Sequence, residues 1–233
     1  MKDKKFSGNV PMQEYDPYLV ISGIPDYAND SSATGEFRSN SMGFRSPEIG
    51  EKRAFRVVVA GGSVVWGTGA SSNEATFPGL MRKVLKQEYG QDVEVINAGM
   101  GAYFSFAELT LVTHRLVYLD PDLVIFFNGY NDVFFSSQIR DEDFVYNQVQ
   151  TYYELKSFLL LSTDAGRKQD LFTIAKRKIT KKLQGKSNFA ELDRTVRLSS
   201  YSGSFSVSLQ GVRNYLKNMA MIFDVLSGQG IAS

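Results

Sequence analysis

The sequence predicts an α/β fold built around a parallel β-sheet. Three short segments rich in β-branched and aromatic residues, 56–60, 93–96 and 123–127, have the composition of buried strands. Two segments in which apolar residues recur at helical spacing, 76–89 and 106–119, alternate with these strands. Strands and helices that alternate over short links form a parallel sheet through right-handed crossovers.

Clear boundary signals delimit the first strand and the first helix. Strand 56–60 reads Arg-Val-Val-Val-Ala and ends at a Gly-Gly pair, which is typical of a strand covered on both faces. In helix 76–89 one face is apolar, and Gly90 provides the end. The residues on that face are Phe77, Leu80, Met81, Val84 and Leu85.

The second helix and the last predicted elements have similar signals. Asp120 and Pro121 stop helix 106–119 just before the third strand. Residues 207–226 return to helical spacing, and the closing letters GQGIAS are typical of a helix cap followed by the first residues of a fourth strand.

The chain divides into four parts on this basis. Residues 1–50 have no sustained period and predict an extended N-terminal arm that wraps the domain, with FRSNSMGFRSPE (37–48) as its most distinctive stretch. Residues 51–135 form the α/β core with its first three strands. Residues 136–204 predict a helical insertion, and residues 205–233 return to the core.

The insertion contains a strongly basic segment at 166–186, with eight Lys and Arg residues against one Asp. Its apolar residues are spaced four apart on one helical face. Such a segment either lies on an anionic surface, such as a membrane or an acidic partner, or packs one stripe and exposes the other to water.

Composition excludes several classes of function. The absence of cysteine excludes disulfides, thiolate metal sites and a cysteine nucleophile, and a net charge of +1 gives no signal for nucleic acid. The basic first residues have no apolar stretch behind them, and no apolar run is long enough to cross a bilayer. As written the chain is expected to be cytoplasmic. No spacing of His, Asp and Glu indicates a metal, and no cofactor is expected.

Three loops follow the three strands, at 61–67, 97–103 and 128–132. In an open parallel sheet such loops form the ligand crevice. Their small residues let backbone amides approach a ligand, and the first loop contains Ser63. A hydroxyl surrounded by neutral hydrogen-bond donors is what acyl transfer requires.

These loops resemble the sequence blocks of the SGNH (GDSL-type) hydrolases. Residues 61–63, Gly-Gly-Ser, are similar to the first block, and Gly-Tyr-Asn-Asp at 129–132 matches the third. The resemblance implies a flavodoxin-like three-layer α/β/α sandwich and makes Ser63 the nucleophile. It also implies an oxyanion hole formed by the Ser63 amide and the Asn131 side chain.

The second block of the family has an asparagine-led loop whose glycine amide completes the oxyanion hole. Five positions after Asn97 the sequence has Ala102, with Gly101 beside it, so the resemblance assigns this role to Gly101 or Ala102. Asp132 is expected to orient its loop, and Trp66 and Tyr130 either line the acyl pocket or serve as packing anchors.

The last block of the family, Asp-x-x-His, is not in the sequence, and neither are the last strands of the sandwich. The single histidine, His114, lies about eleven helical residues beyond the second loop, or roughly 17 Å at about 1.5 Å per residue. We therefore expect a structural or surface role for His114. The chain is then the front part of a longer hydrolase, or a pseudoenzyme.

The sequence thus predicts serine-dependent hydrolysis of short acyl esters such as acetates, with a small-molecule or glycan ester as substrate. One alternative is a non-catalytic binding protein that has the crevice and lacks the base. Another treats the glycines of GGSVVWGTG as a nucleotide loop, although they do not match Gly-x-Gly-x-x-Gly. In a third, Ser63 is an ordinary residue of a tight turn.

Overall fold

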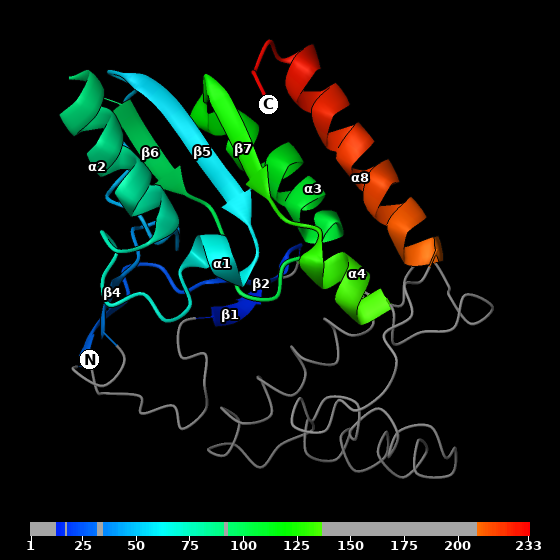
Figure 1. The fold of residues 1–233 in the computed structure, drawn as a ribbon, viewed down its shortest axis with the longest axis horizontal. Coiled ribbons are helices and arrows are strands. Elements are labelled where there is room, and N and C mark those ends of the chain that lie inside the picture. The colour runs from blue at the N-terminus through cyan, green and yellow to red at the C-terminus, as the bar shows by residue number, and fades with distance from the viewer. Residues whose placement is uncertain (1–12, 17, 32–34, 91–92, 137–208) are drawn as a thin grey trace, which may run out of the picture.

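A three-stranded parallel sheet forms the centre of the molecule. The computed structural model describes residues 13–16, 18–31, 35–90, 93–136 and 209–233. Its central sheet has the order β6-β5-β7, where β5 is Phe55–Gly61, β6 is Val93–Asn97 and β7 is Leu123–Phe127 (Figure 1). Both pairings are parallel. The predicted α/β class and the three predicted strands are confirmed.

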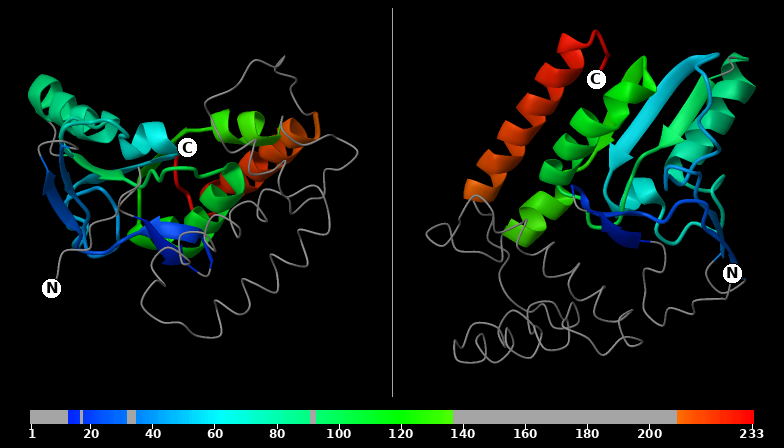
Figure 2. Two further views of the ribbon diagram at one scale, coloured as in Figure 1. Left: turned by 90° about the horizontal axis from the view of Figure 1, so that it is seen from below. Right: turned by 180° about the vertical axis from the view of Figure 1, so that it is seen from behind.

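Helices cover both faces of this sheet. Val57 and Val59 of β5 pack with α1 (Ser63–Trp66) and α2 (Phe77–Tyr89) on one face. Val58 and Ala60 point to the other face and pack with α3 and α8. Helix α3 spans Ser105–His114 and α8 spans Leu209–Gly228, and the two lie side by side (Figures 1 and 2). The alternation of β5 residues thus produces the three layers.

Helix α2 begins and ends where its sequence signals predict. The Thr76 hydroxyl accepts a hydrogen bond from the Gly79 amide at 3.2 Å, and Pro78 occupies the first turn, where its missing N–H costs nothing. Gly90 ends the helix in the left-handed conformation, with φ of 58°.

The predicted helix 106–119 is shorter in the structure. Helix α3 ends at His114, and Arg115 leaves helical geometry with φ of −136° and ψ of −52°. A 3₁₀ turn, η1, then spans Leu116–Leu119. Because three residues complete a turn of 3₁₀ helix, Leu116 and Leu119 point to the same side, and both are buried. Tertiary packing therefore overrides the regular apolar period of the sequence.

The C-terminal residues run along the open edge of β7. Ala232 forms an isolated parallel bridge with Leu123. The Val124 amide donates to the Ala232 carbonyl at 2.8 Å, and the Ala232 amide donates to the Asp122 carbonyl at 3.2 Å. The preceding helix α8 spans Leu209–Gly228, so it ends two residues after the predicted end at 226, and its predicted start at 207 lies outside the described residues.

The N-terminal arm contains regular structure that the sequence did not predict. Strands β1 (Gln13–Asp16) and β2 (Val20–Gly23) form one antiparallel hairpin, and β3 (Ala28–Ser31) and β4 (Gly35–Arg38) form a second. Three apolar side chains of the arm join the core cluster on the α3 face of the sheet: Leu19, Phe37 and Phe44. The described part of the arm therefore packs against the core.

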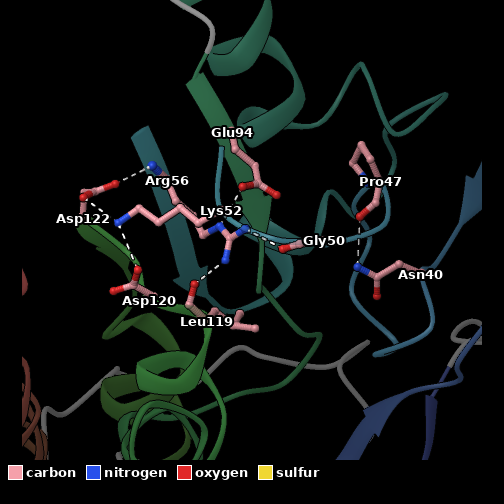
Figure 3. Close-up of polar contacts among 9 residues, drawn as sticks. All are labelled: Asn40, Pro47, Gly50, Lys52, Arg56, Glu94, Leu119, Asp120 and Asp122. Carbon is pink, nitrogen blue, oxygen red and sulfur yellow. Dashed lines mark hydrogen bonds and ion pairs between the residues drawn. The ribbon is translucent and has the colours of Figure 1, made fainter. Parts of the chain in front are cut away.

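Arg56, at the start of β5, ties the amino-terminal ends of the strands together (Figure 3). Its guanidinium binds the Glu94 carboxylate with an Nε–Oε2 distance of 2.6 Å. It also donates to the carbonyl of Gly50 at 2.9 Å and to that of Leu119. The Arg56 amide donates to Asp122 at 2.7 Å. This cluster lies at the opposite end of the strands from the candidate site.

The helical insertion predicted at 136–204 and its basic segment at 166–186 lie outside the described residues, apart from Ser136 at the end of α4 (Tyr130–Ser136). In the part of the chain that the structure describes, no helix combines the length and apolar character that a membrane crossing requires.

Candidate active site

Ser63 is the first residue of α1, directly after the turn that ends β5. The helix is a single turn because Gly67, in the left-handed conformation with φ of 84°, closes it by donating its amide to the carbonyls of Ser63 and Val64. Ser63 is partly exposed, whereas Val65 and Trp66 are buried. The local structure thus presents Ser63 at the carboxyl end of the central strand.

The second loop is bound tightly to this turn. The Ala98 amide donates to the Val59 carbonyl at 2.9 Å, and the Met100 amide donates to the Gly61 carbonyl at 3.0 Å. A Cβ atom on Gly99 would lie 2.5 Å from the backbone nitrogen of Trp66. Only glycine allows the loop to approach α1 so closely.

The third loop reaches the same point through Asn131. Its side-chain Nδ2 donates to the Tyr103 carbonyl at 2.8 Å. The same nitrogen lies 3.0 Å from where a Cβ of Gly62 would be. Asn131 therefore connects the second loop to the residue next to Ser63. An amide NH₂ group has two hydrogens, and this contact uses one of them.

Gly101 and Ala102 form the outer part of the second loop, and both are partly exposed. Ala102 has a φ of +67°, in the left-handed region that favours glycine. The Gly101 carbonyl accepts a hydrogen bond from Gln13 Nε2 of β1 at 2.9 Å. The Ala102 backbone thus has glycine-like geometry, and the N-terminal arm fixes the residue before it.

Asp132 is buried and binds the first residue of α3. Its carboxylate accepts from the Ser105 hydroxyl at 2.6 Å and from the Ser105 amide at 3.1 Å. Burial raises the pKa of Asp132, while these hydrogen bonds act in the opposite direction. The carboxylate is thus engaged in attaching the third loop to α3.

The sequence singled out three other residues: His114, Trp66 and Tyr130. His114 is exposed at the carboxyl end of α3, with its ring 6.2 Å from that of Tyr18. The Trp66 ring is buried 5.1 Å from Phe37, so it is a packing anchor. Tyr130 is 74% exposed.

The structure adds a positioning residue, Arg45, to which sequence reasoning gave no role. Its guanidinium donates to the Gly67 carbonyl at 2.8 Å, to the Trp66 carbonyl at 3.2 Å and to Asn73 Oδ1 at 3.0 Å. It also lies 4.7 Å above the Phe37 ring. Burial lowers the pKa of Arg45 to about 10. The stretch 37–48 was singled out in the sequence, but only the fold shows that it holds the end of α1.

Glu108 is a second residue that the sequence did not single out. It is fully buried on α3, and its carboxylate accepts from Asn128 Nδ2 of the third loop. Burial raises the pKa of Glu108 to about 8. The sequence did contain a signal for Glu108, because it is a charged residue among the apolar positions of the predicted helix 106–119.

Neither a hollow that the structure contains nor a metal site adds to the Ser63 site in the described residues. A hollow of about 290 Å³ lies along β6, lined by Pro47, Arg82 and residues 93–96, and none of Ser63, Ala102 and Asn131 lines it. Among the residues described, no group of three or more His, Asp or Glu side chains could hold a metal ion.

Comparison with solved structures finds esterases at low identity. AlinE4, an SGNH-hydrolase family esterase, is 15% identical, and the match covers 77% of this chain and 98% of AlinE4 with a TM-score of 0.31. The acetyl xylan esterase AlAXEase is 17% identical over 73% of this chain and 99% of its own, with a TM-score of 0.32. A GDSL-like lipase from Bacteroides thetaiotaomicron VPI-5482 is 12% identical over 79% and 70%, with a TM-score of 0.28.

No protein-family model and no curated protein matches the chain. At the TM-scores above, the structural matches assign neither a family nor an activity to it.

Proposed function

We propose that this protein is a serine-dependent ester hydrolase in which Ser63 is the nucleophile. The observation that carries the proposal is the meeting of three loops at one turn: Asn131 Nδ2 lies beside Gly62 and binds the Tyr103 carbonyl. Ser63 follows Gly62 directly. A hydroxyl and several neutral donors are thereby gathered at the carboxyl end of the sheet, where ligands bind in open α/β folds.

In the proposed reaction Ser63 Oγ attacks the ester carbonyl carbon and its proton passes to a base. The carbonyl oxygen becomes an oxyanion, held by the backbone amides of Ser63 and of Gly101 or Ala102 and by the second hydrogen of Asn131 Nδ2. Collapse of the tetrahedral intermediate releases the alcohol with a proton. Water then hydrolyses the acyl-serine.

The substrate class is a short acyl ester such as an acetate, with carbohydrate esters among the candidates. The support is chemical: the four residues assigned to the site, Ser63, Gly101, Ala102 and Asn131, are all neutral, so a neutral ester group suits them better than a phosphate.

The base is the missing part. His114 is the single histidine of the sequence and lies exposed at the far end of α3. We therefore propose that no histidine of this sequence serves as the base. Without a triad histidine, an oxyanion hole and substrate binding still leave about 10³–10⁴-fold catalysis over water.

Chemical rescue tests this function directly. We expect the full chain to hydrolyse p-nitrophenyl acetate slowly and to accelerate when imidazole supplies a base, after the imidazole-only rate is subtracted. Ser63→Ala removes the attacking oxygen, so its rate should equal that of imidazole without protein. Equal protein-dependent rates in wild type and Ser63→Ala would contradict the assignment.

The alternative function is a binding protein that uses the same crevice. The position of His114 is the observation that favours it, because no described histidine can activate Ser63. A binding protein would give no protein-dependent hydrolysis with imidazole, yet would bind a non-hydrolysable ester analogue less tightly after Asn131→Ala.

A further inference from the structure

The loop that carries Asn131 is held from α3 at both of its ends. At one end Asp132 binds the hydroxyl and amide of Ser105. At the other end Asn128 Nδ2 donates to Oε2 of Glu108. Ser105 and Glu108 lie three residues apart, so they occupy the same face of the helix.

Helix α8 closes this cluster from the other side. Tyr215 donates its hydroxyl hydrogen to Asn128 Oδ1 at 3.0 Å, and Asn128 Nδ2 also contacts the sulfur of Met219 at 3.3 Å. Asn218 Nδ2 donates to the Ser105 hydroxyl at 2.9 Å. Helix α8 thus contacts the Asn128 end of the loop directly, and it reaches the Asp132 end through Ser105.

Glu108 is the unusual member of the cluster. Its side chain is fully buried, and among the described residues its Oε1 has no hydrogen-bond partner. A buried carboxylate is stable when a cation or several donors satisfy it, and here one side-chain donor, Asn128, is present. The neutral acid fits this environment better than the carboxylate.

We propose that Glu108, as a neutral acid, is a positioning residue for the Asn128–Asp132 loop, and that its ionisation displaces Asn131 from the turn that presents Ser63. Its consequence for catalysis rests on the proposed function, whereas its effect on the loop does not. The geometry behind it is the continuous path from Glu108 to Asn128, through the loop to Asn131, and on to Tyr103 and Gly62.

Of the groups around Glu108, Asn128 favours its charge through a hydrogen bond, and burial and Asp132 oppose it. Asp132 on α4 repels it, and burial and this repulsion together raise the pKa of Glu108 to about 8. Tyr215 on α8 and Tyr103 in the second loop are the other titratable groups that it influences, and the pKa of each is raised mainly by burial. Arg115 and Asp16, which bind each other, act on Tyr103. Ionisation of Glu108 therefore places a charge in the cluster that the hydrogen bond from Asn128 satisfies in part, while Oε1 needs movement or water to gain a partner.

Nuclear magnetic resonance of the full chain tests the inference without any catalysis. In protein labelled with ¹³C at Glu and Asn side-chain carbonyl carbons, the Glu108 carboxyl signal is followed from pH 6 to 10 beside the side-chain amide signals of Asn128 and Asn131. We expect all three to change with one midpoint near pH 8. The wild-type titration needs no variant, so it stands even where a substitution perturbs folding.

Two variants assign the transition. Glu108→Gln keeps an uncharged side chain that can still accept from Asn128, so the Asn131 signal should no longer change near pH 8. Glu88→Gln, an exposed position on α2, should leave the transition as in wild type. If hydrolysis occurs, its rate in wild type should fall about tenfold per pH unit above the midpoint, and Glu108→Gln should lose this alkaline decline.

The inference is overturned if the Asn131 signal is constant across pH 6–10 in wild type, or if its transition persists in Glu108→Gln. Failure of the proposed function has a different signature, namely hydrolysis that does not depend on Ser63, and it leaves the resonance result unaffected.

Discussion

Ala102 combines a left-handed backbone with a Cβ atom, so the site contains a small amount of strain. An L-residue in this region costs about 1–2 kcal/mol relative to its preferred conformations, and glycine avoids that cost. Because glycine is also more flexible in the unfolded chain, we expect Ala102→Gly to raise the free energy of unfolding by a net ~0.5–1 kcal/mol.

Urea unfolding of Ala102→Gly measures this gain. The matched control is Ala75→Gly, an exposed position without positive φ, which should lose a few tenths of a kcal/mol or more through unfolded-state entropy. Equal losses in the two variants would show that Ala102 is unstrained.

Glu108 couples stability to pH in a direction opposite to that of most carboxyl groups. Its pKa is raised in the folded state to about 8 from a usual 4.5, so the unfolded chain releases the proton first as pH rises. The contribution of Glu108 to the free energy of unfolding is fully present below pH 4.5 and is lost progressively as the pH rises from 4.5 to 8. Over this range the free energy of unfolding falls by at most about 1.4 kcal/mol per pH unit because of Glu108.

The corresponding experiment compares wild type with Glu108→Gln in urea at pH 5, 6, 7 and 8. Because glutamine does not ionise, the stability of the variant relative to wild type should rise steadily over this range. Glu88→Gln should give a difference that changes little with pH. A pH-independent difference for Glu108→Gln would mean that Glu108 is ionised in the folded protein.

Helix α1 is too short to hold its own position, and the N-terminal arm holds it through Arg45. The planar guanidinium of Arg45 reaches Trp66, Gly67 and Asn73 at once, and a lysine ammonium cannot reproduce that set of hydrogen bonds. We expect Arg45→Lys to cost about 2–3 kcal/mol of stability, since buried carbonyls lose their donors.

Arg45→Lys should also lower the reaction rate of Ser63, because α1 loses its anchor. The reaction rate of a surface nucleophile should change by less. Arg213→Lys, exposed on α8, is the control and should change the free energy of unfolding by less than about 0.5 kcal/mol. Arg45→Lys behaving like Arg213→Lys in both measurements would contradict an anchoring role.

Across the whole molecule, the sequence predicted the elements whose pattern is local. Strands β5, β6 and β7 have short β-branched runs, and α2 has its cap residues Thr76 and Gly90, so each is specified by its own residues. The meeting of the three loops followed from the geometry of parallel strands. The two arm hairpins were missed because their short strands lack a clear alternation and are held by contacts with distant residues, such as Tyr103 with Ile21 at 2.8 Å.

The positioning residues of the site were missed for the same reason. Arg45 and Asn73 are 28 positions apart, Glu108 and Asn128 are 20 apart, and Gln13 and Gly101 are 88 apart. No local pattern pairs such residues. The end of α3 differs from the predicted helix end at residue 119. Burial of Leu116 and Leu119 favours a 3₁₀ turn over the helix that the apolar period predicts.

Covalent labelling of Ser63 tests the central claim most directly. The full chain is treated with a fluorophosphonate in the presence of imidazole, and the modified residue is identified by mass spectrometry. We expect one phosphonyl group on Ser63, formed as the serine oxygen displaces fluoride. The adduct should be absent in Ser63→Ala and retained in Ser71→Ala, an exposed serine outside the three loops. Absence of an adduct on Ser63 in wild type, or equal labelling of wild type and Ser63→Ala, would contradict the account.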